Sequence, residues 1–198
     1  MSEEKTLSVG EKIKEVREAK GLTLQELAEK SGYTSALVNQ IENHLESPPL
    51  GALGKIAHAL GVDIGELWGD HGDAPYAIAR KKDRRPVNRF ASKEGVSYGY
   101  SYESLGMGMG SRHIEPFIVT LEPPTVNKTK PSCHEGEEFL YVLNGKLEIE
   151  LDGHKDILEP GDSIQYSAKV PHSLSAVDGK TAQLLAVVWS QEQHREDG

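Results

Sequence analysis

The chain has 198 residues, a formal net charge of −9 and an ordinary apolar content of 37%, which suits one large or two small domains. No stretch approaches the roughly 20 apolar residues of a membrane helix, and the polar start at Met1 lacks the apolar core of a signal peptide. The single cysteine, Cys133, excludes an intrachain disulfide framework and a cysteine-rich zinc site. We therefore expect a cytoplasmic protein.

The charge is unevenly distributed along the chain. Lys and Arg number 7 against 12 Asp and Glu in residues 1–70, 6 against 2 in residues 71–90 and 9 against 17 in residues 91–198. The basic middle is either a solvated linker or an arm that contacts DNA. We divide the chain into a helical domain (1–70), a basic linker (71–90), a β domain (91–190) and a polar tail (191–198).

The first 70 residues predict five short helices. Apolar residues recur at the spacing of one helix face, and glycines end the first and the fourth helix. Thr23 and Glu26 form a capping box at the start of the second helix, because each can satisfy a free backbone amide there. The predicted elements are a helix in residues 7–20, a second from Thr23 to about Lys30, a third capped by Thr34, a fourth from Leu50 to Leu60 and a last one after Asp63 that carries Leu67 and Trp68.

Three segments, residues 22–32, 38–43 and 56–62, resemble the helix-turn-helix domain of the phage-repressor-like XRE family. The resemblance implies that the third helix enters the major groove, with residues near its N-terminus reading bases and their neighbours holding phosphates. The residues that it assigns to DNA are Thr34, Ser35, Ala36, Asn39, Gln40 and Gln25. It also implies an ion pair between Arg17 and Glu42 that links the first helix to the third.

Two features depart from that family. Leu24 stands where many phage repressors have a Gln, and no Lys or Arg lies between Thr34 and Glu42. Phosphate attraction must therefore come from backbone amides, from Lys30 and Lys55 or from the basic linker. A single domain should bind DNA weakly, and a dimer on two half-sites would compensate. The alternative is a helical module used only for packing or dimerisation.

From His113 onward, short β-branched runs alternate with Asn-Gly, Asp-Gly and Pro-Gly-Asp turn signals. The clearest strands are residues 113–121, 139–143, 146–151, 163–166 and 181–189. Many short strands at this spacing predict a closed sandwich or barrel. We expect the apolar run from Phe139 to Leu143 to be buried. Tyr98, Tyr100 and Tyr102 alternate as in a half-buried strand.

His134 and Glu138 are four residues apart, so in an extended segment both can point to one face, where imidazole and carboxylate can bind a metal. The stretch from His134 to Gly145, together with the one from Pro160 to His172, resembles the two motifs of the cupin superfamily. The resemblance implies a small barrel with a metal held by His134, Glu138 and His172. Ser132 stands where that family usually has a further His. Two histidines and one carboxylate match the facial triad that binds iron(II).

The expected cofactor is a divalent metal, whether iron, zinc, manganese or nickel. The alternative is that the same three residues only make the pocket polar. A small ligand in the barrel mouth would meet a further set of residues, whose alternative role is ordinary core and rim packing. These are Tyr98, Tyr100, Tyr102, Arg112, Lys130, Ser132 and Gln165. Cys133 should point away from His134.

Two functions fit these features. The fusion resembles the regulators that join this helix-turn-helix to a cupin barrel, which implies an operator in double-stranded DNA, a small-molecule effector and a homodimer or higher oligomer. The second is a mononuclear non-haem iron(II) oxygenase or epoxidase, because the domain order and triad spacing are similar to those of iron-dependent hydroxypropylphosphonate epoxidases. Pro131 stands where those enzymes have a substrate-binding Asn, so we prefer the regulator and assign no catalytic residue.

Overall fold

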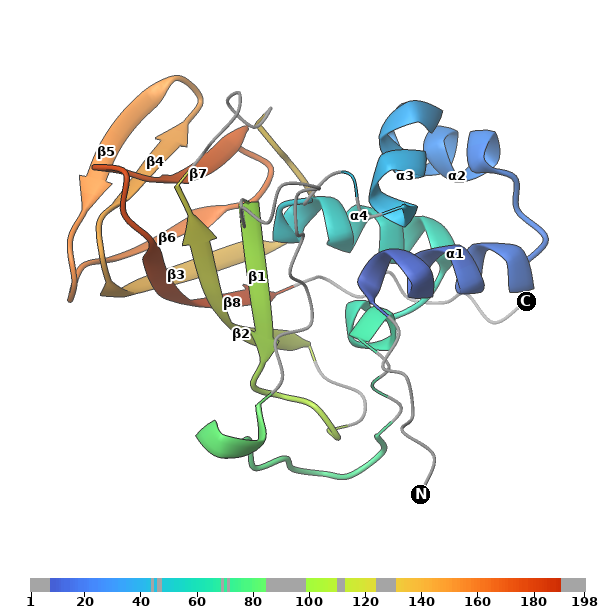
Figure 1. Ribbon diagram of the computed structural model, residues 1–198, viewed down its shortest axis with the longest axis horizontal. Coiled ribbons are helices and arrows are strands. Elements are labelled where there is room, and N and C mark those ends of the chain that lie inside the picture. The colour runs from blue at the N-terminus through green and yellow to red at the C-terminus, as the bar shows by residue number, and fades with distance from the viewer. Residues whose placement is uncertain are drawn as a thin grey trace.

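The computed structural model describes residues 8–43, 45, 48–68, 70, 72–84, 99–109, 113–123 and 131–189. A helical domain and a β domain lie side by side, with helix α4 (Leu50–Leu60) between the β domain and the other helices (Figure 1). The predicted α + β architecture of two domains is confirmed. In the described part of the chain, no helix has the length and apolar character needed to cross a membrane.

In its described residues, the helical domain contains four α-helices and one 3-10 helix. These are α1 (Val9–Ala19), α2 (Leu24–Ser31), α3 (Ser35–Glu42), α4 and the 3-10 helix η1 (Ile64–Trp68). The fifth predicted helix is thus a single 3-10 turn. The capping box of Thr23 and Glu26 is confirmed, since each side chain accepts a hydrogen bond from the other residue's backbone N–H. A second capping box, formed by Ser8 and Glu11 at the start of α1, was not predicted.

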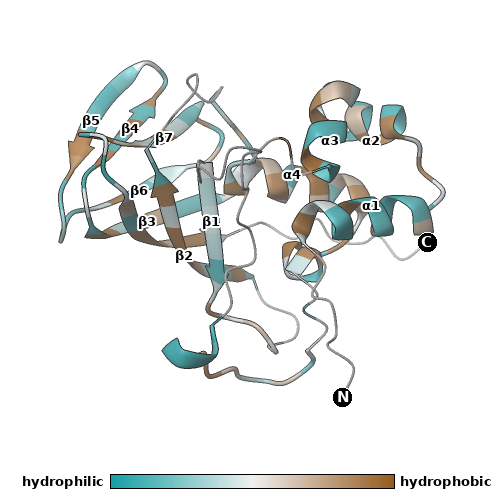
Figure 2. Cartoon of the chain, in the orientation of Figure 1, coloured by the Kyte–Doolittle hydropathy of each residue, from teal (hydrophilic) through white to brown (hydrophobic). Residues whose placement is uncertain are grey.

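The apolar residues of the helices converge on one core. Figure 2 shows brown and teal residues alternating along α1 to α3, as amphipathic helices require. The fully buried members are Val9, Ile13, Leu27, Val38, Ile41, Leu53, Ile56, Leu60 and Leu67. This packing fixes the angle between α2 and α3, which form the helix-turn-helix.

A buried ion pair ties α1 to α3. The Nε of Arg17 donates to Oε1 of Glu42 at 2.6 Å, and its Nη2 donates to Oε2 at 2.9 Å. Its Nη1 also donates to the carbonyl oxygen of Leu22 at 2.8 Å. The ion pair that the resemblance implied is therefore present. The Glu42 carboxylate raises the pKa of Arg17, chiefly through these hydrogen bonds, although burial opposes the shift.

The β domain is built from two antiparallel sheets. The larger has the order β1-β2-β8-β3-β6 and the smaller the order β5-β4-β7. The strands are β1 (Gly99–Ser104), β2 (Ile114–Glu122), β3 (Glu137–Asn144), β4 (Leu147–Leu151), β5 (His154–Leu158), β6 (Ser163–Ser167), β7 (His172–Ala176) and β8 (Ala182–Trp189). The predicted Asp-Gly turns are confirmed at Asp152 and Gly153, where positive φ angles of 47° and 84° suit a two-residue hairpin loop.

Three expectations differ from the observed strands. Strands β5 and β7 were not predicted. The run from Phe139 to Leu143 was expected to be buried, but it alternates. Leu140 and Val142 are buried, whereas Phe139, Tyr141 and Leu143 are 36%, 39% and 41% exposed on the outer face. The cause is the pleat of β3, which turns successive side chains to opposite faces of the sheet.

The described part of the basic linker runs along the β domain. Ala74 makes an isolated bridge with Met109, and the short 3-10 helix η2 (Lys81–Asp83) is exposed. Arg84 lies 3.7 Å from the Glu103 carboxylate on β1. At least one linker cation is therefore directed at the β domain.

The buried ion pair of Arg17 and Glu42 leads to a prediction about the stability of the helical domain. Replacing Glu42 by Gln leaves the Arg17 guanidinium buried without its carboxylate, so we expect a loss of about 3 to 5 kcal/mol in the free energy of unfolding. The measurement is urea unfolding followed by circular dichroism. Glu18→Gln is the control, because Glu18 is exposed and lies 3.5 Å from the same guanidinium, and it should cost less than about 1 kcal/mol. Equal effects for the two variants would contradict a structural role for Glu42.

Candidate metal centre and nucleic-acid interface

The segment before β3 places the first two candidate ligands. Ser132 pairs with His172 in an antiparallel bridge, and the backbone N–H of His134 donates to the carbonyl oxygen of Ala168 at 2.8 Å. Gly136 then adopts a φ of 102°, a conformation that favours glycine. His134 therefore precedes the strand instead of lying in it, and the bend at Gly136 brings its ring over Glu138 at the start of β3.

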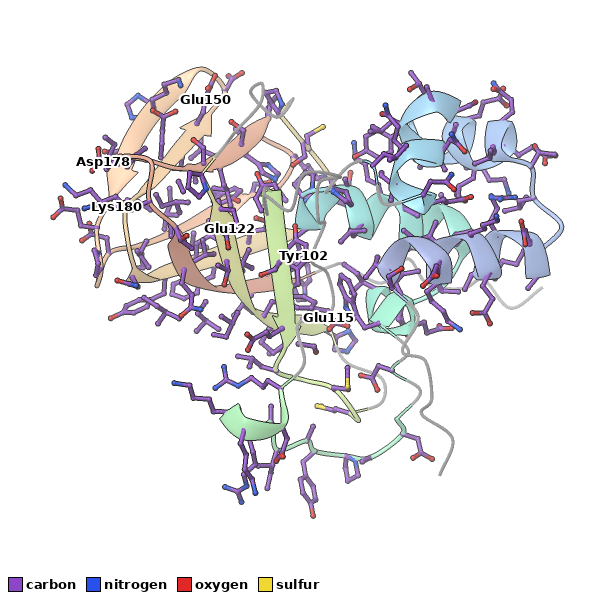
Figure 3. All side chains as sticks on the ribbon, viewed as in Figure 1. Tyr102, Glu115, Glu122, Glu150, Asp178 and Lys180 are labelled. Atoms are coloured by element: carbon purple, nitrogen blue, oxygen red, sulfur yellow. The ribbon has the colours of Figure 1, made fainter. Side chains whose placement is uncertain are left out.

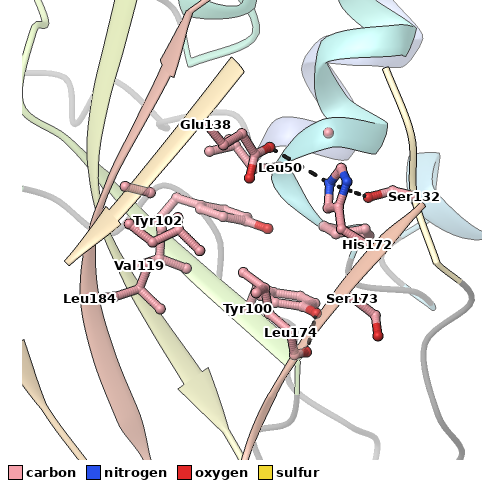
Figure 4. Close-up of a pocket in the computed structure, with 14 residues that line it drawn as sticks. Leu50, Tyr100, Tyr102, Val119, Ser132, Glu138, His172, Ser173, Leu174 and Leu184 are labelled. Carbon is pink, nitrogen blue, oxygen red and sulfur yellow. Dashed lines mark hydrogen bonds and ion pairs between the residues drawn. The ribbon is translucent and has the colours of Figure 1, made fainter. Parts of the chain in front are cut away.

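His134, Glu138 and His172 come together inside the β domain. The Nε2 of His134 lies 2.9 Å from Oε1 of Glu138, and the Nε2 of His172 lies 3.8 Å from the same oxygen. One ligand atom from each residue falls within 4.8 Å of the other two. Figure 4 shows the carboxylate of Glu138 and the ring of His172 facing each other across the pocket.

Hydrogen bonds to the remaining atoms orient each of the three groups. The Nδ1 of His134 lies 3.0 Å from the carbonyl oxygen of Glu135, and that of His172 lies 2.8 Å from the carbonyl oxygen of Val170. Because a carbonyl only accepts, both Nδ1 atoms donate, which directs the two Nε2 atoms to the shared point. The hydroxyl of Tyr166 donates to Oε2 of Glu138 and leaves Oε1 facing the histidines.

The electrostatics favour a cation at this point. Burial raises the pKa of Glu138, but the hydrogen bond from His134 and the charges of both histidines outweigh it, so the net shift is downward. Burial also works against His134, yet its contacts with Glu138 raise its pKa overall. Burial lowers the pKa of His172. The downward shift of Glu138 favours its charged form and that of His172 favours the neutral imidazole, and both are the forms that bind a metal.

These groups fit a divalent first-row metal. Two imidazole nitrogens and one carboxylate oxygen form the set of ligands that leaves further coordination positions open, and Nδ1–H bonds to carbonyl oxygens are typical of metal-binding histidines. The protein groups do not discriminate among iron, zinc, manganese and nickel. A bound metal would act as a Lewis acid towards water or a small ligand.

The triad opens into a mainly apolar pocket. Tyr100 and Tyr102 line it, and the hydroxyl of Tyr100 donates to the carbonyl oxygen of Leu174 at 2.8 Å. Ser132 also faces the pocket, with its hydroxyl 2.9 Å from Nε2 of His172. The other lining residues are Pro49, Leu50, Gly51, Val119, Leu140, Ser173, Leu174, Leu184 and Ala186.

One expected pocket residue points the other way. Gln165 is exposed, and its amide donates to Glu137 on the outer surface at 2.8 Å. Tyr166, which pairs directly with Glu138 across β3 and β6, takes the inward position. The register of β6 is the cause, since a shift of one residue exchanges the two faces. Tyr98, Arg112 and Lys130 lie outside the described residues.

Sequence reasoning also missed the lining residues Leu50 and Gly51. They belong to the helical domain, and no local pattern connects them to the triad. A glycine at the first turn of an otherwise regular apolar helix was the only signal. Cys133 is exposed.

The predicted DNA-binding residues gather at the start of α3. Thr34 is the N-cap, with its hydroxyl accepting from the backbone N–H of Leu37 at 3.2 Å. Ala36, Asn39 and Gln40 are exposed, while Val38 and Ile41 of the same helix are buried. The hydroxyl of Ser35 donates to the exposed amide of Gln25 on α2. The six residues thus form one polar surface across the two helices.

The charges near this surface are sparse. Lys30 is exposed at the end of α2. Lys55, one of the alternative sources of phosphate attraction, lies over the ring of Tyr33 and 4.0 Å from Sγ of Cys133 in the β domain. Acidic residues such as Glu150 and Asp178 lie at the end of the β domain far from the helices (Figure 3).

Comparison with known proteins agrees with both halves of this description. A helix-turn-helix family model matches residues 13–67, and a cupin domain model matches residues 117–188. The (S)-2-hydroxypropylphosphonic acid epoxidase of Streptomyces wedmorensis is 32% identical over an alignment of 198 positions. The alignment covers 94% of this chain and 99% of the enzyme. The chain belongs to the family of proteins that join an XRE-type helix-turn-helix to a C-terminal cupin domain.

Members of this family include regulators as well as an enzyme. The HTH-type transcriptional regulator PuuR of Escherichia coli K12 is 26% identical over 182 residues, covering 91% of this chain and 94% of the regulator. An HTH_3 family transcriptional regulator from Vibrio cholerae has the same fold, with a TM-score of 0.60, 21% identity and coverage of 93% of this chain and 96% of that one. The structure of Fe(II) HppE has a TM-score of 0.50 with 29% identity, covering 91% and 97%.

Substitution of the triad tests the metal centre. Wild-type protein should bind one equivalent of Co(II), and His134→Ala, His172→Ala and Glu138→Gln should each weaken binding at least roughly tenfold. His154→Ala is the control, because His154 is exposed on β5. The measurement is the visible absorption of Co(II). Affinity should fall as the pH is lowered, because protons compete for His134, whose pKa is raised. Equal Co(II) binding in wild type and triad variants would contradict the assignment.

Proposed function

We propose that this protein is a transcription regulator that binds operator DNA through its helix-turn-helix and a small-molecule effector in its cupin pocket. The proposal rests on two features of α3, its exposed polar surface and its buried support. The helix has a polar N-terminal surface exposed to solvent and is held from behind by the buried pair of Arg17 and Glu42. An enzyme pocket alone does not need such a surface. The family's regulators, which match over most of the chain, support the same proposal.

In this function α3 enters the major groove. Ser35, Asn39 and Gln40 can hydrogen-bond base edges, and Ala36 can contact a thymine methyl group. Thr34 and Gln25 are placed for the phosphates beside the groove. We propose that the protein acts in the cytoplasm. Because few cations surround this surface, we also propose that it binds as a homodimer or higher oligomer on two half-sites, which compensates for the weak attraction to phosphates.

The pocket would hold the effector at the metal. Glu138 and the two histidines would hold the metal, which would supply one polar anchor for the effector. The rings of Tyr100 and Tyr102, stacked with centroids 6.2 Å apart, supply flat apolar area for the rest of the ligand. Such a pocket suits a small ligand with one metal-binding group and an apolar or aromatic body.

A DNA-binding assay tests the regulator. The protein should bind the DNA upstream of its own gene, and Asn39→Ala should weaken specific binding by about 1 to 3 kcal/mol through loss of a base contact. Glu15→Ala on the exposed face of α1 is the matched control and should bind as wild type. Electrophoretic retardation at low salt, with and without a chelator, is the measurement. Absence of specific binding under all these conditions would overturn the proposal.

The second candidate is an iron(II) oxygenase, which the triad and the 32% identity to the epoxidase favour. Two observations argue against the epoxidase's substrate, hydroxypropylphosphonate, as the substrate of this chain. Pro131 stands at the position of the substrate-binding Asn, and no Lys or Arg is among the described residues that line the pocket. The described lining therefore offers a phosphonate dianion no Lys or Arg partner.

Oxygen uptake decides between the two candidates. With iron(II) and (S)-2-hydroxypropylphosphonate, we expect the wild type to consume oxygen no faster than His172→Ala, because the described lining has no Lys or Arg to hold the dianion. The measurement is an oxygen electrode trace at saturating iron(II). Substrate-dependent uptake that His172→Ala abolishes would establish the enzyme instead.

A further inference from the structure

The pocket is not made by the β domain alone, because the first turn of α4 forms one of its walls. Gly51 packs directly on the triad. A Cβ added there would lie 2.3 Å from Cδ2 and 2.5 Å from Nε2 of His134, and 3.3 Å from the hydroxyl of Ser132. Leu50 lies beside His172 and Ser132 in Figure 4. The domain that carries the DNA-binding surface therefore covers the candidate metal centre.

Side-chain contacts hold this wall in place. The hydroxyl of Tyr102 on β1 donates to the carbonyl oxygen of Pro48, just before α4, at 2.9 Å. Trp68 at the end of η1 packs against Tyr102 and Phe117, with ring centroids 6.0 and 5.6 Å apart. Its indole N–H is buried without a hydrogen-bond partner among the described residues, which weakens the contact. No strand pairing joins the two domains in the described part of the chain.

The pocket is too small for an organic effector when this wall is in place. Its free volume of about 30 Å³ accommodates only a few water molecules. Apart from Ser132 and Pro49, the remaining lining residues lie on strands held by ladders of backbone hydrogen bonds, which resist movement. The first turn of α4 is therefore the wall that can withdraw at the lowest free-energy cost.

We propose that a ligand bound at the metal displaces Leu50 and Gly51, so that occupation of the pocket separates the helical domain from the β domain. This inference rests on the proposed function and gives its regulatory step. Ligand and closed domain contact compete for the same space, so ligand binding shifts the population towards the open arrangement. Locking the domains together must, by the same linkage, weaken ligand binding.

The chain supplies a native pair of residues for that lock. Lys55 on α4 and Cys133, the single cysteine, lie 4.0 Å apart across the domain contact. N-succinimidyl iodoacetate, a short reagent for one amine and one thiol, should link them in the closed protein. The linked protein is identified by peptide mass spectrometry, purified and loaded with Co(II). Lys55→Arg treated with the same reagent is the control, because its Cys133 and its other lysines can react in the same way but the link to position 55 cannot form.

Two probe ligands of different size are then titrated by visible absorption. Azide is small and should bind the linked and unlinked proteins equally. Imidazole is larger and should bind the linked protein at least roughly tenfold more weakly than the Lys55→Arg control. Leu50→Ala removes the obstructing side chain, so the linked form of this variant should regain imidazole binding.

A pair of glycine variants tests the contact itself. Gly51→Ala should lower either the Co(II) affinity or the yield of the link, because its methyl group displaces His134 or the helix. Gly54→Ala, one turn along the same helix with no atom within 4 Å of its added Cβ, should change neither. Identical behaviour of the two variants would show that α4 does not pack on the triad.

The proposal is overturned if imidazole binds linked and unlinked proteins with equal affinity. It is also overturned if the link does not form, if wild-type protein does not bind Co(II), or if imidazole binds neither wild type nor Leu50→Ala. None of these measurements uses DNA, so they are independent of a failure in the retardation assay.

Discussion

The site depends on a buried carboxylate. Glu138 is 4% exposed, and an ionised group so far from water is stable only where positive or donating groups surround it. Its neighbours supply that compensation from three directions: the bend at Gly136 brings His134, the register of β6 brings Tyr166, and the start of β7 brings His172. The two cupin motifs are thus one electrostatic unit.

The helices could be predicted closely because their signals are local. Capping residues and apolar spacing lie within each helix, as at Thr23 and from Leu50 to Leu60. The missed strands lack such signals. Four of the five residues of β5 are exposed, so it has no apolar alternation, and β7 combines His, Ser and Leu with little burial contrast. In β3 both faces carry apolar residues, which hides the alternation.

The candidate site could be predicted only where sequence neighbours carry it. His134, Glu138 and His172 fell on motif positions, and the structure brings them together. Choosing between Gln165 and Tyr166 required the pairing of β6 with β3, which a run of five residues does not determine. The wall formed by Leu50 and Gly51 joins positions more than 80 residues apart in sequence from His134, and such contacts arise from tertiary packing alone.

Because Gly51 has no side chain, α4 can pack against His134, and this contact limits how the two domains can be recombined with those of other proteins. In a chimera that exchanged whole domains near residue 70, a helix from another protein would cover the cupin pocket. The chimera would then accept different small molecules, although its candidate metal-binding residues would be unchanged. The residues that contact the cupin domain therefore begin at Pro48, well before a boundary drawn at residue 70. The first turn of α4 is part of the pocket in structure, although the helix-turn-helix family model includes it.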